Sequence, residues 1–259
     1  MPIGSDEWPA RSLLGVLPPP ARRQLLALGT EVRFKLGAVL LREGDNDQHA
    51  YLLVSGFAKV TASVENGETS LLAVRAAGDI VGEMAAMTGA PRSATVAACG
   101  PLTARVWQSG ELRRLLECHP LISMALTGTV ADRLRWANRR RLDFRGYPAK
   151  VRLARLLVEL AESYGSSRAD GVVIGCRMTQ QELATMVGAA ETTIHKVLRD
   201  LRGEGLLETG YRSTTVRDLP ELERLAELRV TRAPAPRPAA AEPTASDHEW
   251  RQGRASPIS

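Results

Sequence analysis

Glycines at nearly even spacing divide residues 34–106 into short apolar runs, and this pattern restricts the region to antiparallel β structure. The runs between them include residues 51–54 and 71–74, and the glycines are Gly44, Gly56, Gly67 and Gly78. Strands that alternate with turns roughly every 8–12 residues are typical of β barrels, sandwiches and rolls. Within residues 65–68, Asn66-Gly67 supplies the positive φ angles that a tight hairpin needs. We therefore expect a β domain here, preceded by a short helical segment in residues 10–30.

A long helix is predicted after Pro120, a residue type suited to a first helical turn. Neither glycine nor proline interrupts residues 129–145, and apolar residues recur three or four positions apart at Leu126, Val130, Leu134, Ala137 and Phe144. This stripe suits two arrangements, packing on the chain's own β domain or pairing with the same helix of a second subunit. Gly146-Tyr147-Pro148 should end the helix, because proline cannot continue its hydrogen bonding.

Residues 147–219 predict a winged helix-turn-helix. Thr179 and Glu182 form a capping-box signature at the start of one helix, and Gly188 marks the turn to the next. The second helix has an apolar face of Ile194, Val197, Leu198 and Leu201. Residues 208–216, with Gly210 at the tip, resemble a small β wing. Two helices joined by a short turn, with polar and basic residues outward on the second, fit the DNA major groove.

These patterns predict an α+β fold in four parts, and 259 residues suffice for two compact domains with separate cores. Residues 10–118 form an antiparallel, jelly-roll-like β-roll that serves as effector domain. Residues 119–146 form a dimerisation helix and hinge, and residues 147–219 the winged helix-turn-helix. Residues 220–259 begin with a short helix at 221–229 and end in a Pro-Ala-rich tail that we expect to be disordered.

Cysteine and histidine placement argues against a metal site or a catalytic centre. Cys99, Cys118 and Cys176 are far apart in the sequence, so we interpret them as reduced and structural. The histidines have neither metal-binding spacing nor an evident nucleophile partner, which predicts that the protein is not an enzyme. Because residues before Phe34 contain no cysteine or histidine, an iron–sulfur or haem sensor is disfavoured.

The charge and hydropathy of the chain indicate its partners and compartment. A net charge of +5 and a pI near 9.4 fit a polyanionic partner, either nucleic acid or an anionic membrane. No run approaches 18 apolar residues, and the N-terminus lacks the pattern of a signal peptide. We therefore expect no membrane association and a cytoplasmic location.

From about Leu13 to Leu219 the sequence resembles the Crp/Fnr family of bacterial transcription regulators. Two motifs at the right separation carry the resemblance, namely Gly82-Glu83-Met84 followed by Arg92-Ser93-Ala94-Thr95, and the helix-turn-helix that begins at Thr179. The resemblance implies a cyclic-nucleotide-binding β-roll, a homodimer and binding to double-stranded DNA. RNA polymerase is a further candidate partner.

The first motif has the chemistry that a cyclic nucleotide requires, and the resemblance assigns the same roles. Arg92 would pair with the phosphate and Ser93 donate to it, Glu83 would accept from the ribose hydroxyl, and Gly82 and Met84 would bring main chain close. The alternative is that Glu83 and Arg92 only form an ion pair that closes the loop.

The base-binding positions depart from the family pattern. Cyclic-AMP binders of the family carry two hydroxyl residues on the long helix, where this chain has Ala137 and Asn138. Asn138 keeps a donor and an acceptor and could read either purine or neither. Cyclic AMP is the leading effector candidate, while cyclic GMP, a cyclic dinucleotide or no ligand remain open. We interpret Arg139-Arg140-Arg141 as a solvated helix face rather than a second DNA site.

The recognition helix also departs from the family, whose well-studied members carry Arg, Glu and Arg where this chain has Glu191, Thr192 and Lys196. These three side chains could contact cytosine N4, a thymine methyl group and guanine, respectively. The operator should therefore differ from the family consensus. Residues placed to contact phosphates are Thr179, Gln181, Thr193, Arg199 and Arg212, and His195 is either a phosphate contact or a solvated residue.

The leading hypothesis is a ligand-gated, homodimeric DNA-binding regulator. Ligand at Arg92 and Glu83 would reorganise the long helix, and the hinge at residues 146–148 would move the winged domain. One alternative is a small-molecule sensor that works through protein contacts, favoured slightly because Ala189 and Ala190 provide no N-cap side chain for the recognition helix. Another is a DNA-binding regulator that needs no nucleotide.

Overall fold

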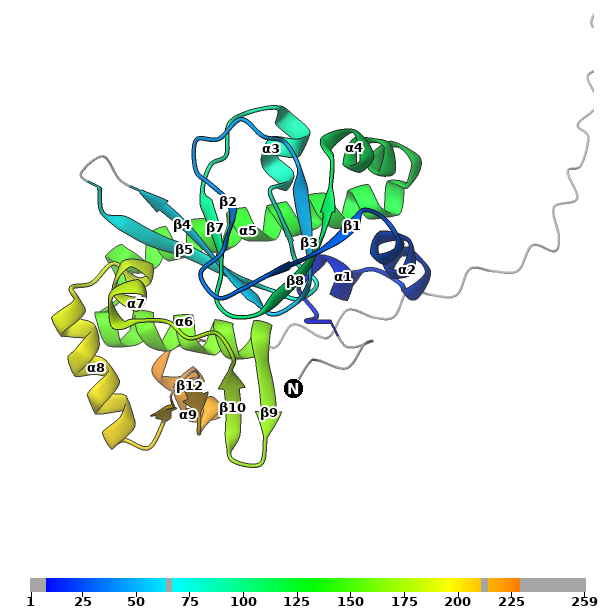
Figure 1. Cartoon of the computed structure of the whole chain (residues 1–259). Helices are drawn as coiled ribbons and strands as arrows, with labels where there is room; N and C mark the ends of the chain where they lie inside the picture. Colours follow the sequence, from blue (N-terminus) through cyan, green and yellow to red (C-terminus); the bar gives the residue numbers. More distant parts are fainter. Residues whose placement is uncertain (1–7, 64–66, 211–213, 229–259) are drawn as a thin grey trace, which may run out of the picture. The chain divides into compact units, whose positions relative to one another are not determined.

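The computed structural model describes residues 8–63, 67–210 and 214–228, and its N-terminal half contains the predicted antiparallel β-roll (Figure 1). Two four-stranded sheets form it, ordered β1-β8-β3-β6 and β2-β7-β4-β5, and their paired strands run antiparallel. The strands are β1 Thr30–Phe34, β2 Val39–Leu41, β3 Ala50–Ser55, β4 Phe57–Ser63, β5 Thr69–Ala76, β6 Ile80–Val81, β7 Thr95–Ala98 and β8 Leu102–Trp107.

Helices precede, interrupt and follow the roll. Its short helices are α1 Leu13–Val16, α2 Pro19–Ala27 and α3 Glu83–Thr88, and α4 Ser109–Cys118 follows the last strand. The predicted hairpin forms between β4 and β5, whose register runs from Phe57 opposite Ala76 to Ser63 opposite Thr69. Residues 64–66 of its turn lie outside the described residues.

The long helix α5 spans Pro120–Gly146 and ends where the sequence predicts. Its first turn holds a proline, and α6, Ala149–Tyr164, begins directly after Pro148. Two arginines of α6 brace this junction. Arg152 donates to the carbonyl oxygens of Phe144 at 3.1 Å and Tyr147 at 3.0 Å, and Arg155 pairs with Asp143 at 2.7 Å.

The C-terminal part has the predicted winged helix-turn-helix. Its helices are α7 Gln180–Val187, α8 Glu191–Gly203 and α9 Leu219–Leu225, and its sheet has the order β11-β12-β10-β9. The wing strands are β11 Leu207–Thr209 and β12 Thr214–Val216. A hairpin of β9 Gly165–Arg168 and β10 Gly171–Ile174 was not predicted, because the Gly-Ser-Ser-Arg strand has no apolar alternation. The expected tail and Arg212 lie outside the described residues.

The roll and the winged domain share apolar packing, whereas the sequence predicts separate cores. Two of three apolar clusters lie within residues 13–130. The third is built mainly from the winged domain but includes Leu71 and Val74 of β5. The amide nitrogen of Leu71 also donates to Thr185 Oγ1 at 3.1 Å, and Lys59 Nζ lies 2.6 Å from a carboxylate oxygen of Glu182. Hairpin β4–β5 thus packs against α7.

Two cysteines that are distant in the sequence meet at this contact. The Sγ atoms of Cys99, after β7, and Cys176, before α7, are 3.4 Å apart. All three cysteines are free thiols, as the sequence predicts, but the proximity of this pair was not predicted, since sequence spacing does not reveal contacts between domains. Within the described residues no group of three or more His, Cys, Asp or Glu residues could hold a metal ion, and no helix is long and apolar enough to cross a membrane.

Candidate ligand cavity and nucleic-acid interface

A cavity of about 480 Å³ lies between the roll and α5. Among its lining residues are five of the six predicted ligand-site residues, which are Gly82, Glu83, Met84, Arg92 and Ser93. The sixth, Asn138, is exposed and does not line the cavity of its own chain. The cavity unites residues from β2, β4, β5, the start of α3, the segment around β7 and α5, which the sequence places up to about a hundred positions apart.

Arg92 is held almost completely buried, with 2% of its side chain exposed. Its guanidinium donates to Asp47 Oδ1 at 2.7 Å, to the Gly82 carbonyl oxygen at 3.0 Å and to the His49 carbonyl oxygen at 2.6 Å. A guanidinium has five N–H groups, so two remain for an anion in the cavity. Gly82 is required beside it, because its φ of +81° is left-handed and a Cβ there would lie 2.8 Å from Arg92 Nη1.

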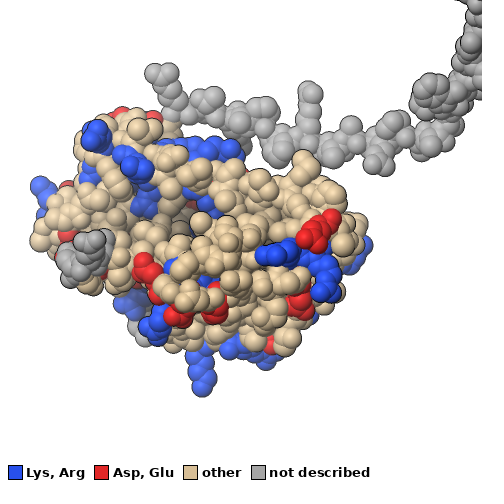
Figure 2. Space-filling view, turned by 90° about the horizontal axis from the view of Figure 1, so that it is seen from above, with Lys and Arg blue, Asp and Glu red and all other residues tan. Residues whose placement is uncertain are grey.

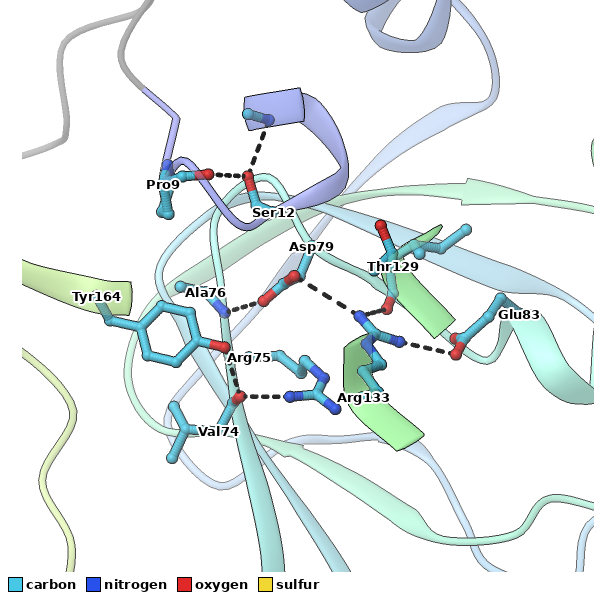
Figure 3. A network of polar contacts seen from close by, with 12 residues as sticks. Pro9, Ser12, Val74, Arg75, Ala76, Asp79, Glu83, Thr129, Arg133 and Tyr164 are labelled. Atoms are coloured by element: carbon cyan, nitrogen blue, oxygen red, sulfur yellow. Dashed lines mark hydrogen bonds and ion pairs between the residues drawn. The ribbon is translucent and has the colours of Figure 1, made fainter. Parts of the chain in front are cut away.

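Glu83 is also buried, at 5% exposure, and its partner is Arg133 of α5 (Figure 3). Arg133 Nη1 lies 2.7 Å from Glu83 Oε1, and Nη2 lies 2.8 Å from the Ile80 carbonyl oxygen and 3.6 Å from Asp79 Oδ1. Glu83 and Arg92 therefore have different partners, and the loop-closing ion pair considered from the sequence is not formed. The role of Arg133 was not predicted from the sequence, because its carboxylate partners Glu83 and Asp79 lie about fifty positions away in the chain.

Tyr164 of α6 reaches the β5 edge next to this ion-pair cluster (Figure 3). Its hydroxyl donates to the Val74 carbonyl oxygen at 3.1 Å, and that oxygen also accepts from Arg75 at 3.0 Å. Burial, the largest cause, raises the pKa of Tyr164 to about 12, so the phenol remains a donor at neutral pH. Arg75, which lines the cavity, and Tyr164 of α6 therefore share one acceptor, and this links the cavity to the helix that begins the winged domain.

The end of the cavity farther along α5 is formed by Leu72 together with aromatic and basic side chains of the helix. The latter are Trp136, Arg140, Arg141 and Phe144, with Ala137 between them. Arg140 is half-buried, and its guanidinium carbon lies 4.4 Å from the centre of the Trp136 ring. The interpretation of residues 139–141 as a solvated face is therefore wrong for Arg140, although Arg139 and Arg141 are exposed.

The cavity is electropositive. Among the described residues its lining includes one carboxylate, Glu83, against five arginines, Arg75, Arg92, Arg133, Arg140 and Arg141. Arg133 neutralises Glu83, and the pairing of Arg92 with Asp47 leaves donors free. Such a lining favours an anionic ligand with an aromatic portion, because arginine donors and an indole face lie within one cavity.

The second predicted site follows one side of α8. Its buried residues are the predicted apolar face, Ile194, Val197, Leu198 and Leu201, and its exposed residues include Glu191, Thr192, Thr193, His195, Lys196 and Arg199. Thr179 and Gln181 are exposed at the start of α7, where Thr179 forms the predicted capping box with Glu182. Ala190 provides no side-chain cap for α8, as the sequence predicts.

Basic side chains are not gathered into one field on the face shown in Figure 2, where they form separate groups with acidic side chains among them. A net positive charge therefore does not by itself locate a nucleic-acid site on that face. The exposed groups of α8 and the α7 N-terminus remain the candidate interface, and the DNA-binding role of each stays a prediction.

Comparison with known proteins matches both parts of the chain. The family model described as cyclic nucleotide-binding domain matches residues 31–119, and the model described as Crp-like helix-turn-helix domain matches residues 151–225. A CRP-like cAMP-activated global transcriptional regulator of Mycobacterium tuberculosis is 27% identical over 195 residues, which cover 75% of this chain and 87% of the relative.

Two further relatives match most of the chain. An anaerobic regulatory protein of Bacillus subtilis is 29% identical over 191 residues, covering 71% of this chain and 77% of that protein. The crystal structure of a CRP/FNR-family transcriptional regulator from Thermus thermophilus superposes with a TM-score of 0.63 at 28% identity, covering 76% of this chain and 98% of that one. All these relatives are named as regulators, none as an enzyme.

Replacing Arg133 by Met should destabilise the protein, because Glu83 and Asp79 would remain buried without their shared cation. We expect the free energy of unfolding to fall by about 3–5 kcal/mol in urea denaturation. Arg135→Met is the matched control, since its partner Asp132 is exposed and such pairs contribute about 0–1 kcal/mol. An equal loss of unfolding free energy in the two variants would mean that the ion pairs of Arg133 do not stabilise the fold.

Proposed function

The chain belongs to the Crp/Fnr family of transcription regulators, and we propose that a cyclic purine nucleotide in its cavity gates binding to operator DNA. The observation that carries this proposal is the position of Arg92, with two free N–H groups, in a cavity that also contains Glu83 and the α5 aromatic residues. The name of the mycobacterial relative, which cites activation by cAMP, supports a nucleotide of this class.

The contacts of the two charged residues suggest how the nucleotide binds. The phosphate would take the free donors of Arg92, with Ser93 as a further donor, as charge-assisted hydrogen bonds. Glu83 keeps its Oε2 oxygen for the ribose hydroxyl, because the Arg133 contact is to Oε1. The base then lies toward Trp136 and Phe144, where aromatic rings can stack on it.

We propose that α5 also pairs with its copy in a second subunit. Leu121, Met124, Leu134 and Leu142 are exposed on this helix, and burying them would remove a large apolar area from water. Asn138 lies midway between Leu134 and Leu142, four residues from each, and so shares their side of the helix. In the dimer its amide would face the partner helix, where a polar residue fixes the register of pairing.

Phe144 is the proposed connection between ligand and DNA. Its side chain lines the cavity and also lies against Gly188, at the turn between α7 and α8, where an added Cβ would be 3.1 Å from Phe144 Cδ1. Arg152 donates to the carbonyl oxygens of both residues. A nucleotide that repacks Phe144 would shift α8, provided that it binds the two arrangements with different affinity.

A second candidate function is a regulator that binds DNA without a nucleotide. One observation favours it, since Arg92 and Glu83 both already have protein partners. Contact with RNA polymerase is proposed on the family resemblance alone. Calorimetric titration with cyclic AMP and cyclic GMP, followed by duplex binding at several salt concentrations, separates these possibilities from a sensor that acts only through protein contacts.

Arg92→Lys should weaken nucleotide binding about tenfold to a hundredfold, because lysine keeps the charge but not the planar set of donors. Lysine is preferable to alanine, because the Arg92 side chain also hydrogen-bonds Asp47, His49 and Gly82. Removing the whole side chain would destabilise the segments that carry these three residues. The measurement is calorimetric titration with both cyclic nucleotides. Arg23→Lys, at an exposed position of α2, is the control and should titrate as wild type. Unchanged affinity in Arg92→Lys would place the anion elsewhere.

Lys196→Ala should reduce sequence preference, whereas Arg199→Ala should reduce affinity for every duplex. The physical reason is that base-edge contacts discriminate and phosphate contacts do not. Competition between a duplex selected from a random pool and its scrambled version measures both effects, with about 1–3 kcal/mol of discrimination lost for lysine. Equal losses on both duplexes for Lys196→Ala would contradict its assignment to a base.

A further inference from the structure

We propose that Arg140 makes the base end of the cavity select guanine over adenine, so that the effector is a guanine cyclic nucleotide. This inference rests on the proposed function, because it specifies the purine that the same cavity takes. It differs from the expectation of cyclic AMP, which follows from the family resemblance and from no contact made by this chain.

Arg140 stands where the base must lie if the ribose is at Glu83. Arg133, which holds Glu83, and Arg140 are seven residues apart, two turns along the same side of α5 and about 10 Å along its axis. Both side chains line the cavity. A purine nucleotide has a comparable length from ribose to the outer edge of its base.

The donors of Arg140 are largely unused by the protein. Among the described residues its one hydrogen bond is to the Leu72 carbonyl oxygen at 3.5 Å, the outer limit of such a contact. Burial, the main cause, lowers the pKa of Arg140 to about 10, while Glu159 and Asp143 oppose the shift, so the group remains charged at neutral pH. A ligand with hydrogen-bond acceptors would pair with the N–H groups of Arg140, which are partly shielded from water.

Guanine offers the matching edge and adenine does not. Guanine O6 and N7 are adjacent acceptors that bind one arginine bidentately, whereas adenine places its N6 amino donor beside N7. The other lining residues at this end are apolar, aromatic or, in Arg141, again a donor. No side-chain acceptor of the described lining residues stands there for the adenine amino group.

Calorimetric titration of the full chain with cyclic GMP and cyclic AMP tests the proposal. Wild type should bind cyclic GMP about tenfold to a hundredfold more tightly. Arg140→Gln should remove or reverse this preference, because an amide can pair with N6 and N7 of adenine. Arg139→Gln, at an exposed position of α5 outside the lining of this cavity, is the control and should keep the wild-type ratio. Thermal melting of each variant checks that it is folded.

The titration results distinguish guanine selection, the role of Arg140 and nucleotide binding itself. Equal or tighter binding of cyclic AMP by wild type overturns guanine selection and leaves the proposed function standing. An unchanged ratio in Arg140→Gln, or an equal change in Arg139→Gln, overturns the assignment to Arg140. The absence of heat with both nucleotides overturns the proposed function and this inference together.

A different observation, the 3.4 Å separation of the Cys99 and Cys176 Sγ atoms, carries a second inference. We infer that a peroxide oxidant joins these thiols in a reversible disulfide between the roll and the winged domain. The bond length of a disulfide is about 2.05 Å, so only a small approach is needed. Cys99 is half-buried and Cys176 buried, which leaves Cys99 as the thiol that meets the oxidant.

The local environment favours Cys99 as the first nucleophile. The hydrogen bond from the Cys176 thiol lowers the pKa of Cys99, with Lys59 contributing, although burial opposes the shift. The Cys99 thiolate attacks one oxygen of hydrogen peroxide, the O–O bond breaks, and the leaving hydroxide takes a proton to form water. Cys176 then attacks the sulfenic sulfur, the S–O bond breaks, and its proton leaves with that oxygen as a second water.

Peptide mass spectrometry after peroxide treatment tests this bond. We expect a Cys99–Cys176 cross-link in wild type and in the Cys118→Ser control, reversed by dithiothreitol and absent from Cys99→Ser and Cys176→Ser. Failure of the cross-link to form, or a Cys118 cross-link in its place, overturns the proposal.

Discussion

The ion pairs of Arg133 hold the long helix on the roll, and most of the site depends on them. One guanidinium contacts two buried carboxylates, Glu83 and Asp79, together with the Ile80 carbonyl oxygen. Buried carboxylates are tolerated only with partners that compensate their lost hydration. Arg133 therefore positions both α5 and the carboxylate proposed for the ribose, so the ligand site and the helix position are linked by the same atoms.

Contacts at the far end of α5 link this helix to the DNA-binding part. Phe144 touches the cavity on one side and the helix-turn-helix turn on the other, while Arg152 and Arg155 of α6 bind carbonyl and carboxylate groups around the hinge. The junction at residues 146–148 is therefore braced by charged side chains. Movement there requires exchange between two hydrogen-bonded arrangements, which is what a two-state regulator needs.

The sequence predicted several elements from signals between neighbouring residues. The glycine spacing, the Thr179 capping box and the Gly146–Pro148 break each depend on neighbouring residues, and the roll, α7 and the end of α5 formed accordingly. Contacts between distant segments were not predictable in this way. The pairing of Glu83 with Arg133, the burial of Arg140 against Trp136 and the approach of Cys99 to Cys176 depend on tertiary packing, to which sequence spacing gives no guide.

The shared packing of β5 with the winged domain has a consequence for how the chain folds. Leu71 and Val74 belong to the same apolar cluster as Leu157, Ile194 and Leu201. Neither half can complete this cluster alone, so loss of one half exposes apolar surface on the other. We therefore expect the unfolding of the two halves to be coupled. Exchanging the winged domain for that of a relative would then require changes in β5 as well, which ties the evolution of DNA preference to the surface of the effector domain.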